Sequence, residues 1–162
     1  MADVDPENEK LERETGVEVC LFHADGRENI EGVFLPGEEV VVEVSWDPQS
    51  SLRGFDLRLV WETDGKGTDD RETVLRETWE SELRGEMKKS VRWILPRGPL
   101  SCDGSLLRIR WFVDCYINPA GIRARRDVVL SSTGAPVVLP KGKDDGEIEK
   151  LLNKFIGSRK AP

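Results

Sequence analysis

The feature that most constrains the fold is a strict alternation of apolar and polar side chains in several separate segments. In segment 40–46, valines and a tryptophan occupy every second position, and Glu43 and Ser45 lie between them. Successive side chains of a β-strand point to opposite faces of a sheet, so this period predicts a strand with one buried face. The same pattern predicts strands over 55–62 and 106–117.

The remaining chain supplies further strands separated by turn residues. β-rich runs are predicted at 17–22, 30–35, 72–82, 87–95 and 123–139, the last interrupted near 131–136. The run at 72–82 is polar and irregular, which is typical of an edge strand. About eight strands joined by turns favour an all-β fold, an antiparallel β-sandwich, over βαβ units.

The tryptophans are consistent with one core between two sheets. Trp46, Trp61, Trp93 and Trp111 all fall on predicted inward faces. Large aromatic side chains dominate the packing of such cores, so a shared aromatic core is expected. Trp79 lies on the predicted edge strand, and the pattern gives it no clear place in the core.

The chain divides into three parts by composition. Residues 1–15 are acidic and nearly free of apolar side chains, which predicts a flexible tail. Residues 16–140 hold the predicted sandwich. Residues 141–162 begin with a charged, glycine-containing linker and continue as a predicted helix.

The predicted C-terminal helix is short and amphipathic. Ile148, Leu151, Leu152 and Phe155 have the spacing of a single helical stripe. A short helix is marginal alone, so this stripe must pack on its own domain, on a second copy of the chain or on a partner. Leu151, Leu152 and Phe155 are therefore candidate interaction residues, and a homodimer is possible.

Charge and cysteine content limit the compartments and the classes of partner to be expected. The net charge of −7 disfavours nonspecific binding to nucleic acid, and no run approaches the roughly 20 apolar residues of a membrane span. The N-terminal residues lack the apolar stretch of a secretory signal. Cys20, Cys102 and Cys115 are odd in number and show no C-x-x-C spacing. We therefore expect free thiols and a cytoplasmic protein.

No residue pattern indicates an enzyme or a cofactor. The single histidine, His23, lies beside a turn with Asp25 nearby, but no nucleophile is marked, so a histidine without a catalytic role is expected.

Two acidic loops leave a metal site open as an alternative. In an antiparallel arrangement the loops 63–71 and 97–105 fall at the same end, where carboxylates could converge on Ca²⁺. The residues concerned are Asp64, Asp69, Asp70 and Asp103. No fixed ligand spacing supports such a site, so a charged hairpin turn is the favoured interpretation and no metal is expected.

A set of arginines is expected on one outer face of a sheet. The candidate interaction residues are Arg58, Arg108, Arg110, Arg123 and Arg125, with Arg126 nearby. On an acidic protein they could recognise a partner rich in carboxylates or phosphates. The favoured alternative is ion pairing across strands, with Asp56, Glu62, Asp114 and Asp127 as the acidic partners.

Two segments resemble the arrestin-like β-sandwich family. The first is Gly32-Val33-Phe34-Leu35 leading into the strand at 39–46. The second is Trp93-Ile94-Leu95-Pro96, followed by the loop 99–104 and the long strand at 106–115. Cys102 stands where that family usually has an aromatic residue. The resemblance covers about residues 30–139 and one domain, so the interdomain and receptor-binding residues of arrestins are not carried over.

The resemblance implies a non-enzymatic protein-interaction module of adaptor or scaffold type. A general immunoglobulin-like sandwich is the alternative fold, without the cysteine pair of antibody domains. The alternative function is a carbohydrate- or Ca²⁺-binding accessory domain, which would use loop aspartates and aromatic residues such as Tyr116 or Trp79.

Overall fold

The alternating segments form β-strands in the computed structural model, which describes residues 6, 16–47, 53–67, 69–80, 88–118 and 123–139. The strands are β1 (Val17–His23), β2 (Val33–Phe34), β3 (Glu39–Trp46), β4 (Gly54–Gly65), β5 (Arg71–Trp79), β6 (Lys88–Ile94), β7 (Cys102–Asp103), β8 (Leu107–Asn118), β9 (Arg123–Leu130) and β10 (Val137–Val138). No helix among these residues has the length and apolar character needed to cross a membrane. The predicted tail at 1–15 (apart from Pro6) and the C-terminal helix lie outside the described residues.

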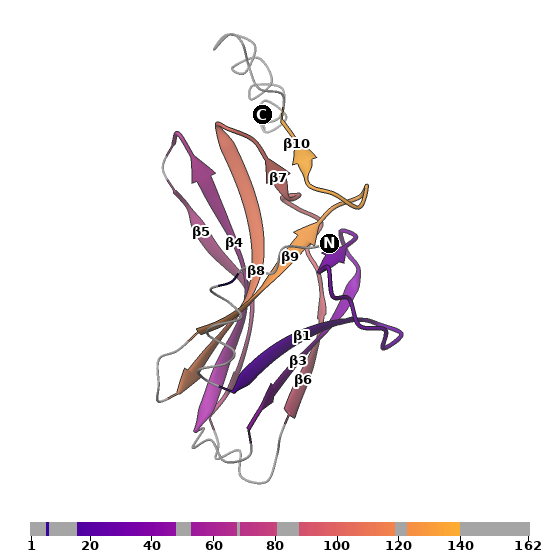
Figure 1. Cartoon of the computed structure of the whole chain (residues 1–162), viewed down its shortest axis with the longest axis vertical. Coiled ribbons are helices and arrows are strands. Elements are labelled where there is room, and N and C mark those ends of the chain that lie inside the picture. The colour runs from indigo at the N-terminus through magenta and orange to yellow at the C-terminus, as the bar shows by residue number, and fades with distance from the viewer. Residues whose placement is uncertain are drawn as a thin grey trace, which may run out of the picture.

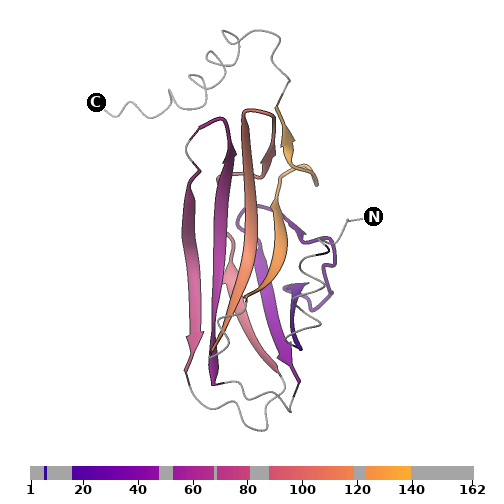
Figure 2. The same cartoon turned by 60° about the vertical axis from the view of Figure 1, so that its left-hand side comes forward.

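The strands form two sheets, and the predicted all-β class is confirmed. The smaller sheet has the order β1-β3-β6, and the larger has the order β10-β7-β8-β4-β5, with β9 paired to β8 and β2 to β9 (Figures 1 and 2). Most strands pair antiparallel as predicted, but β2 pairs with β9 and β10 pairs with β7 in parallel, so the larger sheet is mixed. These parallel pairs are short and join segments distant in sequence, so no local turn signal reveals them.

One hydrophobic core lies between the two sheets, as the alternation predicts. In β3 every second residue is buried, from Val40 through Trp46. Trp46, Trp93 and Trp111 are buried, and Trp61 is half-buried against the same core. Trp79 also packs there, with its ring centroid 4.7 Å from that of Phe55. The edge of the larger sheet thus contributes an aromatic side chain to the core.

The predicted strand at 30–35 is reduced to β2, because a tight turn precedes it. The Asn29 side chain accepts a hydrogen bond from the Gly32 amide at 3.0 Å and donates to the Val33 carbonyl at 2.6 Å. Gly32 has a φ of +67°, and a Cβ there would lie 2.4 Å from the Asp127 carbonyl oxygen. Only glycine fits this contact with β9. Ile30, in the turn, is 65% exposed.

The predicted edge strand is confirmed as β5, which ends the larger sheet. It pairs with β4 alone among the described strands, and the register shifts between Leu59 and Val60. Bulges and charged side chains are the usual means of keeping an exposed edge from pairing with other molecules. Glu72 and Glu77 are exposed on this strand, so its composition fits that role.

Strand β8 has two different neighbours along one edge. Strand β9 pairs with it from Tyr116 up to Trp111, and then continues to pair with β2. Strand β7 takes the next place on β8, opposite Ile109. Arg110 therefore lies where β7 and β9 separate. We call this place the fork (Figure 1).

Candidate functional site

The outer face of the larger sheet, turned away from the small sheet, carries a network around a buried carboxylate. Arg125 donates hydrogen bonds to both oxygens of Asp114, at 2.7 and 2.9 Å. Arg71 donates to Oδ2 of Asp114 at 2.6 Å and to the Tyr116 hydroxyl at 2.9 Å. Glu62 forms ion pairs with Arg71 at 2.6 Å and with Arg125 at 3.0 Å. We call Glu62, Arg71, Asp114 and Arg125 the Asp114 cluster.

Strand register explains why these groups meet. Asp114 lies opposite Arg125 on β9, and Glu62 lies opposite Arg71 on β5. The Asp114 side chain has 0% exposure. Burial by itself would lower the pKa of Arg125, but its hydrogen bonds to Asp114 and Glu62 raise that pKa above its ordinary value. The guanidinium therefore stays charged in its half-buried position.

A second carboxylate on the same face, Asp56, is also held by arginines. Arg76 donates to its two oxygens, each at 2.8 Å, and Arg58 donates to Oδ2 at 2.9 Å. The Arg58 guanidinium lies 4.5 Å from the centroid of the Tyr116 ring. Because Tyr116 also accepts from Arg71, the contacts run continuously over β5, β4 and β8.

The acid stability of the protein is expected to depend on Asp56. Burial raises the pKa of this carboxyl, but the hydrogen bonds from Arg76 and Arg58 outweigh burial and lower it below its usual value. A lowered folded-state pKa stabilises the protein above the unfolded value, about pH 4, and this contribution disappears as the pH falls through the folded value. Asp56→Asn should therefore flatten the decline of the free energy of unfolding below about pH 4.

Chemical denaturation at a series of pH values measures this slope. Arg76→Gln serves as the matched variant, because it removes one of the two arginines that bind Asp56 and should flatten the slope only in part. An Asp56→Asn protein with the wild-type slope would contradict the assignment.

An apolar pair lies on the outer face between the charged groups. Val60 and Phe112 are opposite each other on β4 and β8 and are buried, at 0% and 3% exposure. The Arg125 guanidinium covers the Phe112 ring at 3.9 Å from its centroid, and that of Arg110 lies at 5.4 Å. Sequence reasoning did not single out Phe112. The signal was an aromatic residue on the outward positions of β8, between Arg110 and Asp114.

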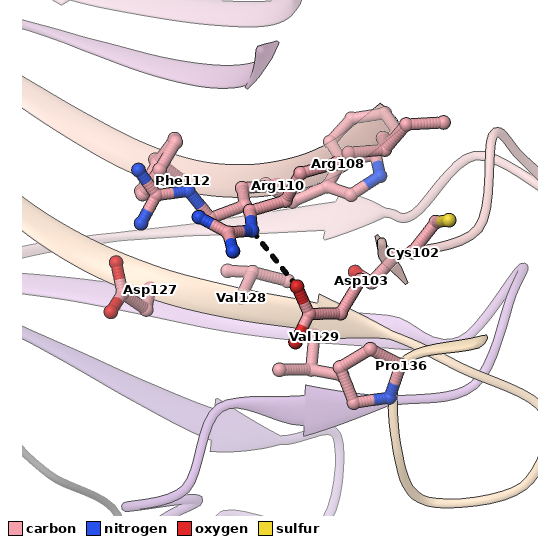
Figure 3. Close-up of a pocket in the computed structure, with 12 residues that line it drawn as sticks. Cys102, Asp103, Arg108, Arg110, Phe112, Asp127, Val128, Val129 and Pro136 are labelled. Atoms are coloured by element: carbon pink, nitrogen blue, oxygen red, sulfur yellow. Dashed lines mark hydrogen bonds and ion pairs between the residues drawn. The ribbon is translucent and has the colours of Figure 1, made fainter. Parts of the chain in front are cut away.

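The fork contains a hollow of about 300 Å³, which we call the fork hollow (Figure 3). Its walls come from β7, β8, β9 and the segment before β10. The lining residues are Ser101, Cys102, Asp103, Arg108, Ile109, Arg110, Trp111, Phe112, Asp127, Val128, Val129 and Pro136.

Arg108 joins the two acidic loops at one end of the molecule. Its Nε donates to Asp103 at 2.9 Å (Figure 3). Its Nη1 lies 3.8 Å from Asp64. The loops therefore meet as expected for antiparallel strands, but an arginine lies between these two carboxylates. The described residues include no group of three or more side chains placed to hold a metal ion.

The arginines of the predicted surface differ in whether they form ion pairs with carboxylates. Arg58, Arg108 and Arg125 each have carboxylate partners. Arg110 is exposed, contacts Phe112, and makes no ion pair with any described residue. Arg123 lies opposite Tyr116 in the register. The side chain of Arg123 and the residues Leu151, Leu152 and Phe155 lie outside the described part of the chain.

The histidine has a partner that the sequence did not reveal. His23 Nδ1 lies 2.7 Å from Oε1 of Glu38, and its ring centroid is 5.4 Å from that of Phe34. Asp25, the neighbour considered from sequence, is bound by Arg27 instead. The pair joins the end of β1 to the turn before β3.

All three cysteines are free in the structure. Burial, with smaller contributions from Asp56 and Asp114, raises the pKa of the Cys115 thiol to about 12. Since the thiolate is the reactive form, Cys115 should not react with a thiol reagent at pH 8 until the protein unfolds. Mass spectrometry of protein labelled before and after addition of denaturant checks this. Labelling of native Cys115 at the unfolded rate would contradict the assigned register of β8.

The comparisons with known proteins give no family. No protein-family model and no curated protein matches the chain. Among solved structures, the chain is similar to the sporulation control protein Spo0M of Bacillus subtilis, with 16% identity and a TM-score of 0.44, over 88% of this chain and 56% of that chain. It is also similar to the superoxide reductase (neelaredoxin) of Ignicoccus hospitalis, with 12% identity and a TM-score of 0.38, over 71% of this chain and 80% of that one. Similarities at this level carry no inference about function.

Proposed function

We propose that the chain is a non-enzymatic protein-interaction module of adaptor type, built on an immunoglobulin-like or arrestin-like β-sandwich. Two features of the outer face support this. The Asp114 cluster and the arginines over the Phe112 and Tyr116 rings connect the side chains of this face. A surface that is ordered before binding loses less entropy when a partner docks. Most of the charged groups on this face form ion pairs with one another.

The observation that carries the proposal is the state of Arg110. This exposed arginine borders the fork hollow, lies against Phe112, and has no carboxylate partner among the described residues. Arginine is enriched at the centres of protein interfaces, where its planar group binds carboxylates and stacks on rings. We assign the recognition of a partner protein to this region and the protein itself to the cytoplasm, in line with its free thiols.

Differential capture from cells of the source organism tests the proposal. Tagged wild type is compared with Arg110→Glu and with Arg53→Glu. The second variant makes the same charge change at an exposed arginine just before β4, at the other end of the sheet. We expect a defined protein to be retained by wild type and Arg53→Glu and lost with Arg110→Glu. Identical sets of captured proteins for all three forms would overturn the assignment of the binding surface.

A further inference from the structure

The fork hollow exists because two strands leave β8 in different directions. Strand β9 leaves β8 beyond the Trp111–Val128 pair to join β2, and β7 begins at the Cys102–Ile109 pair. Between these pairs, none of the described strands lies beside Arg110 on that side. The resulting hollow of about 300 Å³ is at the small end of ligand sites. This size suits one or two side chains of a peptide.

The Arg110 guanidinium lies over a buried aromatic ring. It lies 5.4 Å from the centroid of the Phe112 ring. The Arg125 guanidinium also lies over this ring, at 3.9 Å from the centroid. Phe112 is only 3% exposed, so its ring is enclosed by neighbouring side chains. An arginine stacked on a ring keeps the edge of its planar fork available for two parallel hydrogen bonds to a carboxylate.

The ion pairs of the charged residues in the fork hollow indicate which charge a ligand would carry. Arg108 is paired with Asp103, and Asp127 already has an interaction of its own. Arg110 is therefore the only cation lining the hollow that has no ion pair with the described residues. The two arginines and two aspartates of the lining balance in charge, so the hollow offers one guanidinium, that of Arg110, to a single carboxylate. A phosphate monoester carries about −1.5 to −2 and would be repelled by Asp103 and Asp127.

Apolar groups line the hollow beside Arg110. Val129 and Pro136, both partly exposed, lie along the side formed by β9 and the segment before β10 (Figure 3). An aliphatic side chain next to a carboxylate in a peptide can contact them and gain from burial.

We propose that the fork hollow binds an acidic–aliphatic segment of a partner protein. The segment's carboxylate is held by Arg110, and its neighbouring aliphatic side chain contacts Val129 and Pro136. This inference rests on the proposed interaction function and names the chemistry that the partner presents.

Peptide titrations followed by amide and arginine side-chain NMR test it. The probes are the capped tripeptides acetyl-Leu-Asp-Leu-amide, its Asn counterpart and its phosphoserine counterpart. We expect the Asp peptide to shift the signals of residues 109–112 and 128–129 saturably, and the other two to bind at least about tenfold more weakly, since a charge-assisted pair is lost or a second charge is repelled. Arg110→Gln should weaken the Asp peptide by a similar factor, whereas Arg53→Gln should not.

Each other outcome overturns the inference. Equal binding of the Asp and Asn peptides excludes carboxylate recognition, and tighter binding of the phosphoserine peptide assigns the hollow to phosphate. Shifts confined to other regions, or no binding up to about 10 mM, exclude the hollow as the site for such segments. Loss of a captured protein with Arg110→Glu alongside any of these results would leave the interaction function intact and reject only the ligand class. Unchanged thermal unfolding of Arg110→Gln confirms that the variant is folded.

Discussion

Replacing Trp111 with alanine is expected to lower the free energy of unfolding by about 3–5 kcal/mol, the range for removing a large aromatic side chain from a packed core. The Trp111 side chain is 1% exposed and lies in the core between the two sheets. Its Nε1 donates a hydrogen bond to the Pro99 carbonyl at 2.8 Å. The variant therefore loses apolar contacts, leaves a cavity and deprives a loop carbonyl of its donor.

Equilibrium unfolding in urea at pH 7 measures this loss. The conservative variant Trp111→Phe keeps most of the ring but not the donor, so its loss should be clearly smaller. If the alanine variant lost less than about 1 kcal/mol, Trp111 would not be in the core and the register of β8 would be wrong.

Replacing Asp114 with alanine is expected to cost about 3 kcal/mol, because Arg125 is left mostly buried without its main carboxylate partner. Removing one member of a buried ion pair typically costs about 3–5 kcal/mol, since the remaining charge is poorly solvated. The lower end applies here because Glu62 still accepts a hydrogen bond from Arg125 at 3.0 Å. The Asp114 side chain is fully buried, and that of Arg125 is 14% exposed.

The matched control is Glu39→Ala, which removes the carboxylate of an exposed pair. Arg92 and Glu39 are 62% and 34% exposed, and such surface pairs contribute about 0–1 kcal/mol. Urea unfolding of both variants under the same conditions should show the larger loss for Asp114→Ala. Equal losses would mean that the Asp114 cluster is energetically an ordinary surface network.

The long strands were predictable because their signal is local. In β3, β4 and β8 a buried face forces every second residue to be apolar, and this pattern survives in the sequence whatever the partner strands are. The two-residue strands are different. The sequence suggested a loop at β7 and a longer strand at β2, because two residues cannot show a period and their pairing depends on distant segments.

The candidate site was predictable only as a set of residue types. Alternation placed Arg58, Arg108, Arg110 and Arg125 on outward positions, and acidic partners were anticipated for such arginines. Strand register and the approach of loops decide which arginine makes no ion pair with the described residues. Arg108 meets Asp103 and Asp64, whereas the neighbouring Arg110 meets Phe112.

The sequence by itself determined the all-β class, the inward faces of the long strands and the identity of the edge strand, since each follows from side-chain periodicity and composition along a short stretch. The tertiary structure decided the separation of β9 from β8, the burial of Asp114 and the fork hollow beside Arg110. These features arise where segments far apart in the chain meet. Strand pairing and burial there depend on the whole core, so no local pattern encodes them.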